Sequence, residues 1–177
     1  NPLLVDAVEW AGQVLEDAGL STLLISAGMP SRRTSGPRID GRALGALNGF
    51  EGVALRYANV CGPRQDPKSE AGVVSIFVSR LLAGQPLSIF GDGKQTRDYV
   101  SVKDVARANV LASSAALPAD ADHDARAFNI ATGVERTVLE LAEAAGRVTG
   151  RKPELRMEAA RPGEILRSAL DVKKAAG

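Results

Sequence analysis

Apolar segments typical of buried strands alternate with segments of helical spacing, and this alternation constrains the fold more than any other feature of the chain. The strand-like segments are residues 20–28, 52–60, 86–90, 98–102, 126–133 and 153–157. The helical segments are residues 2–18, 39–49, 70–83, 103–115 and 137–147, with Asp171 as a candidate cap of a terminal helix. Strands that alternate with helices favour an α/β fold with a doubly wound, mostly parallel sheet.

Individual helix ends carry recognisable stop and start signals. Asn1 and Pro2 suit the N-cap and first position of a helix, and Gly19 suits its C-terminal end. Thr137 and Glu140 have the spacing of a capping box, in which each side chain accepts a hydrogen bond from the backbone N–H of the other residue. These signals favour real helices at both ends of the chain.

Charge and cysteine content exclude several classes of partner. The 177 residues carry 22 basic and 21 acidic side chains, so a formal charge of +1 gives no reason to expect a nucleic-acid partner. The Arg32-Arg33 pair is too short a basic run to change this. One cysteine excludes an internal disulfide and fits a reducing compartment, and no apolar run is long enough to cross a membrane. We therefore expect a cytoplasmic protein without a membrane partner, and the missing initiator Met suggests a processed or truncated chain.

Residues 90–106 contain a glycine turn that could bind phosphate, and they read FGDGKQTRDYVSVKDVA. A dinucleotide-binding loop needs G-x-G-x-x-G between a strand and a helix, whereas here two glycines are followed by charged residues. The segment therefore does not read as a dinucleotide loop.

That segment belongs to a longer resemblance. The stretch from Arg56 to Asn109, followed by FNIATG at 128–133 and ARPGE at 160–164, resembles the nucleotide-sugar epimerases and dehydratases of the extended short-chain dehydrogenase/reductase family. UDP-glucose 4-epimerases are the most similar members, and the resemblance covers residues 52–171. It implies an NAD cofactor on a Rossmann-like sheet, a smaller C-terminal substrate lobe, and a UDP-glucose or UDP-galactose substrate. We expect residues 1–61 to be a remnant of the dinucleotide-binding domain and residues 62–177 to form the substrate-binding region.

The resemblance also implies roles for single residues on the substrate side. Arg97 and Arg161 correspond to arginines that contact the nucleotide diphosphate, and Asn59 to an asparagine at the substrate phosphate. Without the resemblance, Arg97 would be read as an ion pair with Asp98 or another carboxylate, and Asn59 as a polar turn residue. The remaining predicted substrate-binding residues are Gly72, Val73, Phe90, Tyr99 and Glu164.

Several of those residues have simpler alternatives. Glu164 corresponds to an acid near the ribose and Phe90 to a residue beside the uracil, but a phenylalanine at a strand end also fits a hydrophobic core. Gly72 and Val73 correspond to backbone contacts at a helix N-terminus, where N–H groups favour anions. Tyr57 corresponds to a residue of the nicotinamide pocket and is the one predicted cofactor contact, with packing as its alternative.

The catalytic residues of the family are not found at their positions. The family uses a Tyr-x-x-x-Lys acid/base pair, in which the lysine lowers the tyrosine pKa. Tyr57 is followed by Cys61, and Tyr99 with Lys103 fits the spacing but lies in the RDYV segment. Arg38 and Arg42 stand where the pair is expected, and an arginine cannot transfer the proton. Ser26 is the candidate for the helper serine.

These departures leave the activity open. The sequence also contains no G-x-x-G-x-x-G loop. We predict an NAD-dependent 4-epimerase that transfers hydride at sugar C4 but is weakly active or inactive alone. The alternatives are a non-catalytic nucleotide-sugar-binding module and a fragment that needs a partner chain.

Three further expectations concern single features. Cys61 is expected as a small buried apolar side chain, because no second cysteine or histidine motif supports reactivity. His123 stands among acidic residues and is expected in a solvated loop, so we predict no metal site. An unpaired edge of the sheet predicts a homodimer or association through that edge.

Overall fold

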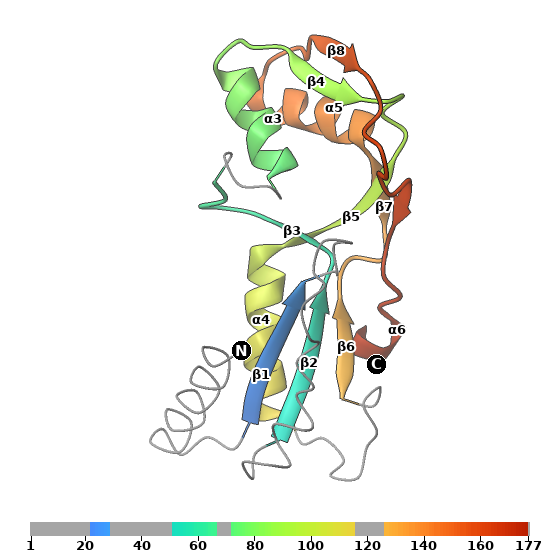
Figure 1. Ribbon diagram of the computed structural model, residues 1–177. Coiled ribbons are helices and arrows are strands. Elements are labelled where there is room, and N and C mark those ends of the chain that lie inside the picture. The colour runs from blue at the N-terminus through green and yellow to red at the C-terminus, as the bar shows by residue number, and fades with distance from the viewer. Residues whose placement is uncertain (1–21, 29–50, 67–71, 116–125, 177) are drawn as a thin grey trace, which may run out of the picture. The chain divides into compact units, whose positions relative to one another are not determined.

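A computed structural model describes residues 22–28, 51–66, 72–115 and 126–176 of the chain (Figure 1). The chain divides into two compact units. The first unit contains residues 1–57, 105–130 and 173–177, and the second contains residues 58–104 and 131–172. Within the described residues, no helix is both long and apolar enough to span a bilayer.

The first unit is built on a parallel sheet whose order is β1, β2, β6 (Figure 1). These strands are β1 (Thr22–Gly28), β2 (Glu51–Tyr57) and β6 (Ala127–Ile130). The central strand buries Val53 and Leu55 almost completely, as expected where a strand has a neighbour on each side. Helix α4 (Val102–Ser114) contributes buried Val105, and its Asn109 amide hydrogen-bonds the Tyr57 hydroxyl at 2.8 Å. The terminal helix α6 (Lys173–Ala176) also belongs to this unit.

Among its described residues, the second unit contains two helices and six short strands. In chain order they are β3 (Asn59–Cys61), α3 (Val73–Leu82), β4 (Leu87–Phe90), β5 (Thr96–Ser101), β7 (Glu135–Thr137), α5 (Val138–Thr149), β8 (Leu155–Glu158) and β9 (Arg167–Ser168). Strand β5 pairs with β3 and β9 in parallel and with β7 in antiparallel orientation. Strand β4 pairs in parallel with β8.

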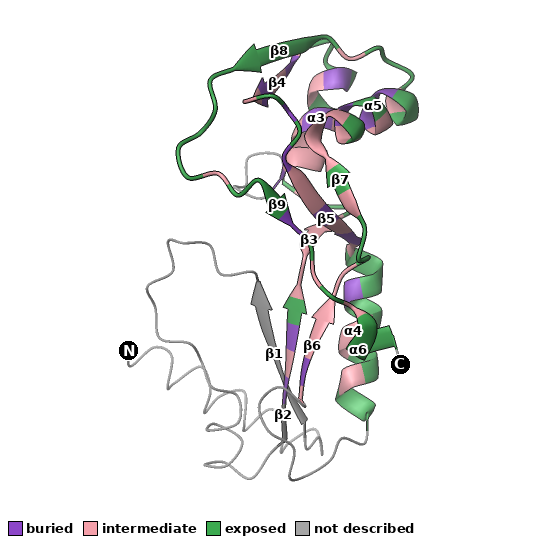
Figure 2. Cartoon of the chain, turned by 90° about the vertical axis from the view of Figure 1, so that its right-hand side faces the viewer, coloured by how far each residue is buried: buried purple, intermediate pink, exposed green. Residues whose placement is uncertain are grey.

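The core of the second unit lies between β4 and helices α3 and α5 (Figure 2). Leu87 and Ile89 of β4 are fully buried, and they pack with Phe77 and Leu81 of α3. Helix α5 contributes buried alanines, Ala142 and Ala145, whose small side chains allow close approach. The alternation along β4 leaves Ser88 and Phe90 only partly buried, so that one face of the strand is available for a site.

The predicted fold class is confirmed. Five of the six strand pairings among the described residues are parallel, as in an α/β sheet. The capping box also forms, since the Glu140 N–H donates to Thr137 Oγ1 at 3.1 Å and the Thr137 N–H donates to Glu140 Oε2 at 2.7 Å. The expected helices over 2–18 and 39–49 lie outside the described residues.

The single strand expected over residues 52–60 is wrong. Strand pairing is interrupted at Ala58, and β2 and β3 belong to different sheets with different partners. The apolar pattern of the sequence continues through Ala58, so it does not indicate that β2 and β3 pair with different strands. Two very short strands, β7 and β9, were also not expected, because both are formed only through their pairing with β5.

Candidate functional site

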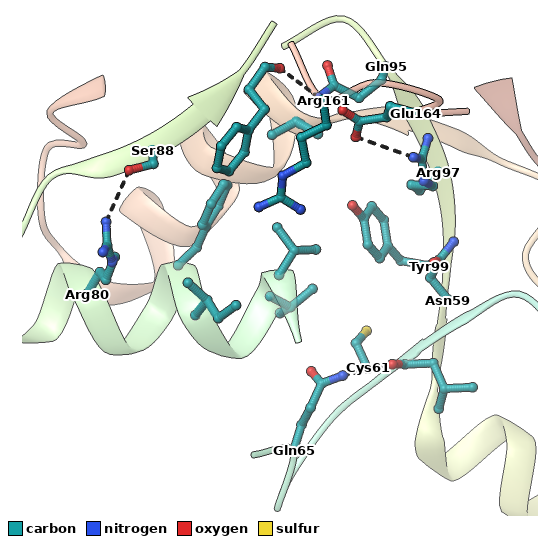
Figure 3. A pocket seen from close by; sticks show the side chains of 17 residues that line it. Asn59, Cys61, Gln65, Arg80, Ser88, Gln95, Arg97, Tyr99, Arg161 and Glu164 are labelled. Atoms are coloured by element: carbon teal, nitrogen blue, oxygen red, sulfur yellow. Dashed lines mark hydrogen bonds and ion pairs between the residues drawn. The ribbon is translucent and has the colours of Figure 1, made fainter. Parts of the chain in front are cut away.

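The second unit encloses a cavity of about 450 Å³, a size typical of small-molecule sites (Figure 3). Strands β3, β4 and β5, helix α3 and the segment after β8 supply its walls. Its charged lining residues are three arginines and one glutamate, namely Arg80, Arg97, Arg161 and Glu164. An excess of guanidinium groups in a concave site favours an anionic ligand.

The glycine turn between β4 and β5 serves packing. Gly93 has φ +71°, and a Cβ built on it would lie 2.8 Å from Leu139 Cγ and 2.9 Å from Ile89 Cγ2. The Leu139 N–H donates to the Gly93 carbonyl at 3.2 Å, and the Lys94 N–H donates to Asp92 Oδ1 at 2.9 Å. The turn therefore packs against helix α5, and it positions β5 at the cavity wall.

Alternation along β5 places two side chains on the cavity and two in the interior. Arg97 and Tyr99 line the cavity, whereas Asp98 and Val100 are buried. The Asp98 carboxylate accepts hydrogen bonds from the Thr132 N–H at 3.0 Å, the Thr132 hydroxyl at 2.6 Å and the Gly133 N–H at 2.8 Å. Asn59 donates to the Asp98 carbonyl at 3.1 Å. These bonds hold β3, β5 and the turn after β6 in fixed relation.

Arg97 is anchored in one orientation. Its Nη1 donates to the carbonyls of Thr96 at 2.8 Å and Ile165 at 2.6 Å, and its Nη2 lies 3.6 Å from Glu164 Oε1. The carboxylate partner is thus Glu164, and Asp98 is bonded to Thr132 and Gly133 instead. A guanidinium held by backbone carbonyls loses little further side-chain conformational entropy when it binds a phosphate oxygen.

Arg161 lies over the ring of Phe90, with 3.7 Å between its guanidinium carbon and the ring centroid. Figure 3 shows this guanidinium between the Arg80 side of the cavity and the side formed by Tyr99 and Arg97. The stacking is a cation–π contact, which keeps the positive charge within the cavity. The N–H groups lie in the plane of the guanidinium, so the stacked ring does not use them.

Tyr99 presents a buried hydroxyl that has no hydrogen-bond partner among the described residues. Burial raises the pKa of this phenol, and the nearby Arg97 guanidinium only partly opposes the rise. The hydroxyl therefore stays protonated near neutral pH and can donate to a ligand. A raised pKa is the opposite of what a tyrosine acid/base needs.

Most predicted substrate residues meet at this cavity. Seven of them line it: Asn59, Val73, Phe90, Arg97, Tyr99, Arg161 and Glu164. Gly72 is the buried N-cap residue of α3 next to Val73. Tyr57 belongs to the first unit, where Asn109 holds its hydroxyl, and Ser26 lies in β1 opposite Leu55.

Other lining residues were not expected from the sequence. Arg80, Ser88, Gln95 and Cys61 also face the cavity. Cys61 is half-buried at the cavity wall, so its expected position in the core is wrong, and burial raises the pKa of its thiol. Arg80 could have been predicted from its helical spacing, because it lies one turn after Ile76 and Phe77, which also line the cavity. No group of three or more potential metal ligands occurs in the described ranges, and Arg38, Arg42 and His123 lie outside them.

Comparisons with known proteins show which proteins this chain is similar to. The chain is 46% identical over 129 residues to a putative UDP-glucose 4-epimerase of Methanocaldococcus jannaschii, covering 73% of this chain and 40% of that protein. It is 47% identical over 118 residues to the UDP-glucose 4-epimerase of Mycolicibacterium smegmatis, covering 67% of this chain and 36% of that protein. The chain thus spans less than half the length of these relatives.

Solved structures give the same result. The UDP-glucose 4-epimerase of Thermotoga maritima, solved with UDP-glucose, matches with a TM-score of 0.75 and 31% identity over 95% of this chain and 60% of its own. The Thermus thermophilus enzyme, solved with NAD, matches with a TM-score of 0.69 and 32% identity over 93% and 60%. The model of the NAD dependent epimerase/dehydratase family matches residues 41–131, more than half of the chain. The chain therefore belongs to the NAD dependent epimerase/dehydratase family.

Proposed function

We propose that this chain binds a UDP-sugar such as UDP-glucose or UDP-galactose in the cavity of its second unit, as the substrate-binding part of a UDP-sugar 4-epimerase. The observation that carries this proposal is the meeting of Arg97, Arg161 and the Tyr99 hydroxyl on one cavity of about 450 Å³. These groups are donors, and two of them are permanently charged, which suits the oxygens of a diphosphate.

Each residue has a distinct part in this binding. Arg97, anchored by the Thr96 and Ile165 carbonyls, and Arg161 neutralise the diphosphate. The Tyr99 hydroxyl donates to a phosphate or ribose oxygen and thereby gains the partner it lacks in the described structure. Glu164 is the one carboxylate of the lining, so it suits a donor such as a ribose hydroxyl.

Asn59, Val73 and Gly72 complete the proposed substrate contacts. Asn59 lies at the cavity while its amide bonds the Asp98 carbonyl, which leaves the rest of the amide for the ligand. Val73 and Gly72 bring the first turn of α3 to the cavity wall, where N–H groups without helical partners favour the phosphate.

NAD, when bound to a member of this family, accepts a hydride from the sugar and returns it. The sequence contains no G-x-x-G-x-x-G loop that would bind the phosphates of this dinucleotide, and the Tyr57 hydroxyl is hydrogen-bonded to Asn109. We therefore assign no step of the hydride transfer to residues of this chain. Ser26 as helper serine, Tyr57 as a nicotinamide contact, and the division into residues 1–61 and 62–177 stay predictions, as does the cytoplasmic location.

A second candidate is a nucleotide-sugar-binding module without catalysis. It is favoured by the presence of Arg97, Arg161 and Asn59 at one cavity, while Arg38 and Arg42 stand where the acid/base pair of the family is expected. The two candidates share the binding site and differ only in turnover. Incubation of the chain with UDP-galactose and NAD separates them, and we expect little or no UDP-glucose to form. Turnover at rates typical of the family would contradict the second candidate.

Titration calorimetry with UDP-glucose tests the binding itself. We expect Arg97→Ala to weaken binding by about tenfold or more, because it removes a charged hydrogen-bond donor from the phosphate site. Arg147→Ala is the matched control, since Arg147 is an exposed arginine of α5 that does not line the cavity. Absence of binding by the unmodified chain, or equal binding by both variants, would refute the proposal.

A further inference from the structure

Arg80 and Ser88 form a second polar group in the cavity, apart from the residues assigned to the diphosphate. Arg80 Nη1 donates to Ser88 Oγ at 3.3 Å and to the Pro86 carbonyl at 3.1 Å. Figure 3 shows this pair at one side of the cavity, while Arg97, Tyr99 and Asn59 lie at the other. The proposed function leaves this side of the cavity without an occupant.

The Arg80 side chain keeps unused donor capacity. Both of its hydrogen bonds leave from Nη1, and within the described ranges no carboxylate forms an ion pair with it. A guanidinium has five N–H donors, so Nε and Nη2 remain for a ligand. Arg80 is half-buried, and a half-buried cation gains more from an acceptor than an exposed one does.

The neighbours of this pair suit a flat ring. Phe90 follows Ser88 by two residues on the same face of β4, and Phe77 of α3 also lines the cavity. The Ser88 hydroxyl accepts from Arg80, so its own proton remains available for a further acceptor. Donors beside aromatic surface select a planar group that carries acceptors on its edge.

We propose that Arg80, supported by Ser88, is a specificity-determining residue that reads a carbonyl oxygen on the edge of the nucleobase. Uracil and thymine carry two carbonyl oxygens each, which accept from these donors. Adenine has no carbonyl oxygen, and the amino group that stands in the place of the uracil O4 is a donor that cannot accept from a guanidinium. This inference rests on the proposed nucleotide-sugar function and adds to it the group that selects the base.

Binding of UDP, dTDP, ADP and inorganic pyrophosphate by the full chain tests the inference. The variants are Arg80→Met, which keeps the length of the side chain without donors, and Ser88→Ala. Arg147→Met is the matched control on the neighbouring helix. We expect the unmodified chain to prefer UDP and dTDP over ADP by about tenfold or more. Arg80→Met should lose about tenfold in UDP affinity and most of that preference, and Ser88→Ala about threefold.

Inorganic pyrophosphate, which has no base, distinguishes recognition of the nucleobase by Arg80 from binding of the phosphates by its charge. The inference requires Arg80→Met to bind pyrophosphate as the unmodified chain does, whereas an equal loss for pyrophosphate and UDP would make Arg80 a phosphate ligand and overturn it. Normal UDP binding by Arg80→Met also overturns the inference but leaves the proposed function intact. No UDP or UDP-glucose binding by the unmodified chain overturns both. Unfolding curves of the variants verify their fold.

Discussion

Asp98 illustrates how one buried residue organises the site without touching the cavity. Its carboxylate is completely buried and accepts three hydrogen bonds from Thr132 and Gly133. Its neighbours in β5, Arg97 and Tyr99, lie on the opposite face and line the cavity. The positions of Arg97 and Tyr99 therefore depend on the buried Asp98 carboxylate.

We expect Asp98→Asn to destabilise the fold by about 2 kcal/mol or more. An asparagine amide cannot accept on its nitrogen, so at least one of the three donors to this buried side chain loses its partner. Urea unfolding followed by circular dichroism measures the change. Asp92→Asn is the control, because Asp92 is exposed and an asparagine can still accept from the Lys94 N–H. Equal stability of the two variants would show that the Asp98 bonds contribute nothing.

Glu135 carries the one strongly shifted carboxyl pKa in the described part of the chain. Its hydrogen bonds from Arg167, at 2.6 and 3.1 Å, and from the Thr96 hydroxyl lower the pKa from 4.5 to about 2. A pKa that is lower in the folded state means that the ionised form favours folding. This stabilisation is fully present above pH 4.5 and is lost as the pH falls toward 2.

We therefore expect Glu135→Gln to lower the thermal midpoint at neutral pH, by an amount that shrinks between pH 4.5 and 2. Midpoints recorded over this pH range by circular dichroism test the expectation. Glu143→Gln is the control, since Glu143 is exposed on α5. A Glu135→Gln difference that stays constant down to pH 2 would contradict the linkage.

At the scale of elements, the turn at 91–93 connects the core strand β4 to the cavity strand β5. Gly93 and Gly84 both have positive φ, at +71° and +67°, but only Gly93 is enclosed by side chains. The pair therefore separates the effect of backbone conformation from that of packing.

We expect Gly84→Ala to cost about 1 kcal/mol, from the left-handed backbone alone. Gly93→Ala should cost about 1–3 kcal/mol more, since its Cβ would collide with Leu139 and Ile89. Urea unfolding of both variants gives the difference. Similar losses would mean that Leu139 and Ile89 move aside at little cost.

At the scale of the whole molecule, we expect association through the edge of the first unit's sheet that no described strand covers. Among the described strands, β1 pairs only with β2, on one of its two edges. An open edge in a parallel sheet exposes backbone donors and acceptors and favours association. We expect a homodimer or larger species in light scattering coupled to gel filtration. A monomer that persists at high protein concentration would contradict this expectation.

The sequence by itself determined the α/β class and the capping box of α5, and it predicted the substrate residues from Asn59 to Glu164, seven of which line the cavity. These properties reside in local patterns or in motifs whose order along the chain is preserved, so they can be read without coordinates. The cavity residues Arg97 and Arg161 were found in this way.

Only the tertiary structure decided which residues meet. It separated residues 52–60 into β2 and β3, buried Asp98 under Thr132 and Gly133, and paired Arg97 with Glu164. It also brought Arg80 of α3 to Ser88 of β4 and moved Cys61 from the expected core to the cavity wall. Each of these depends on contacts between segments distant in the sequence, and a local pattern specifies which face a side chain takes but not what lies opposite that face.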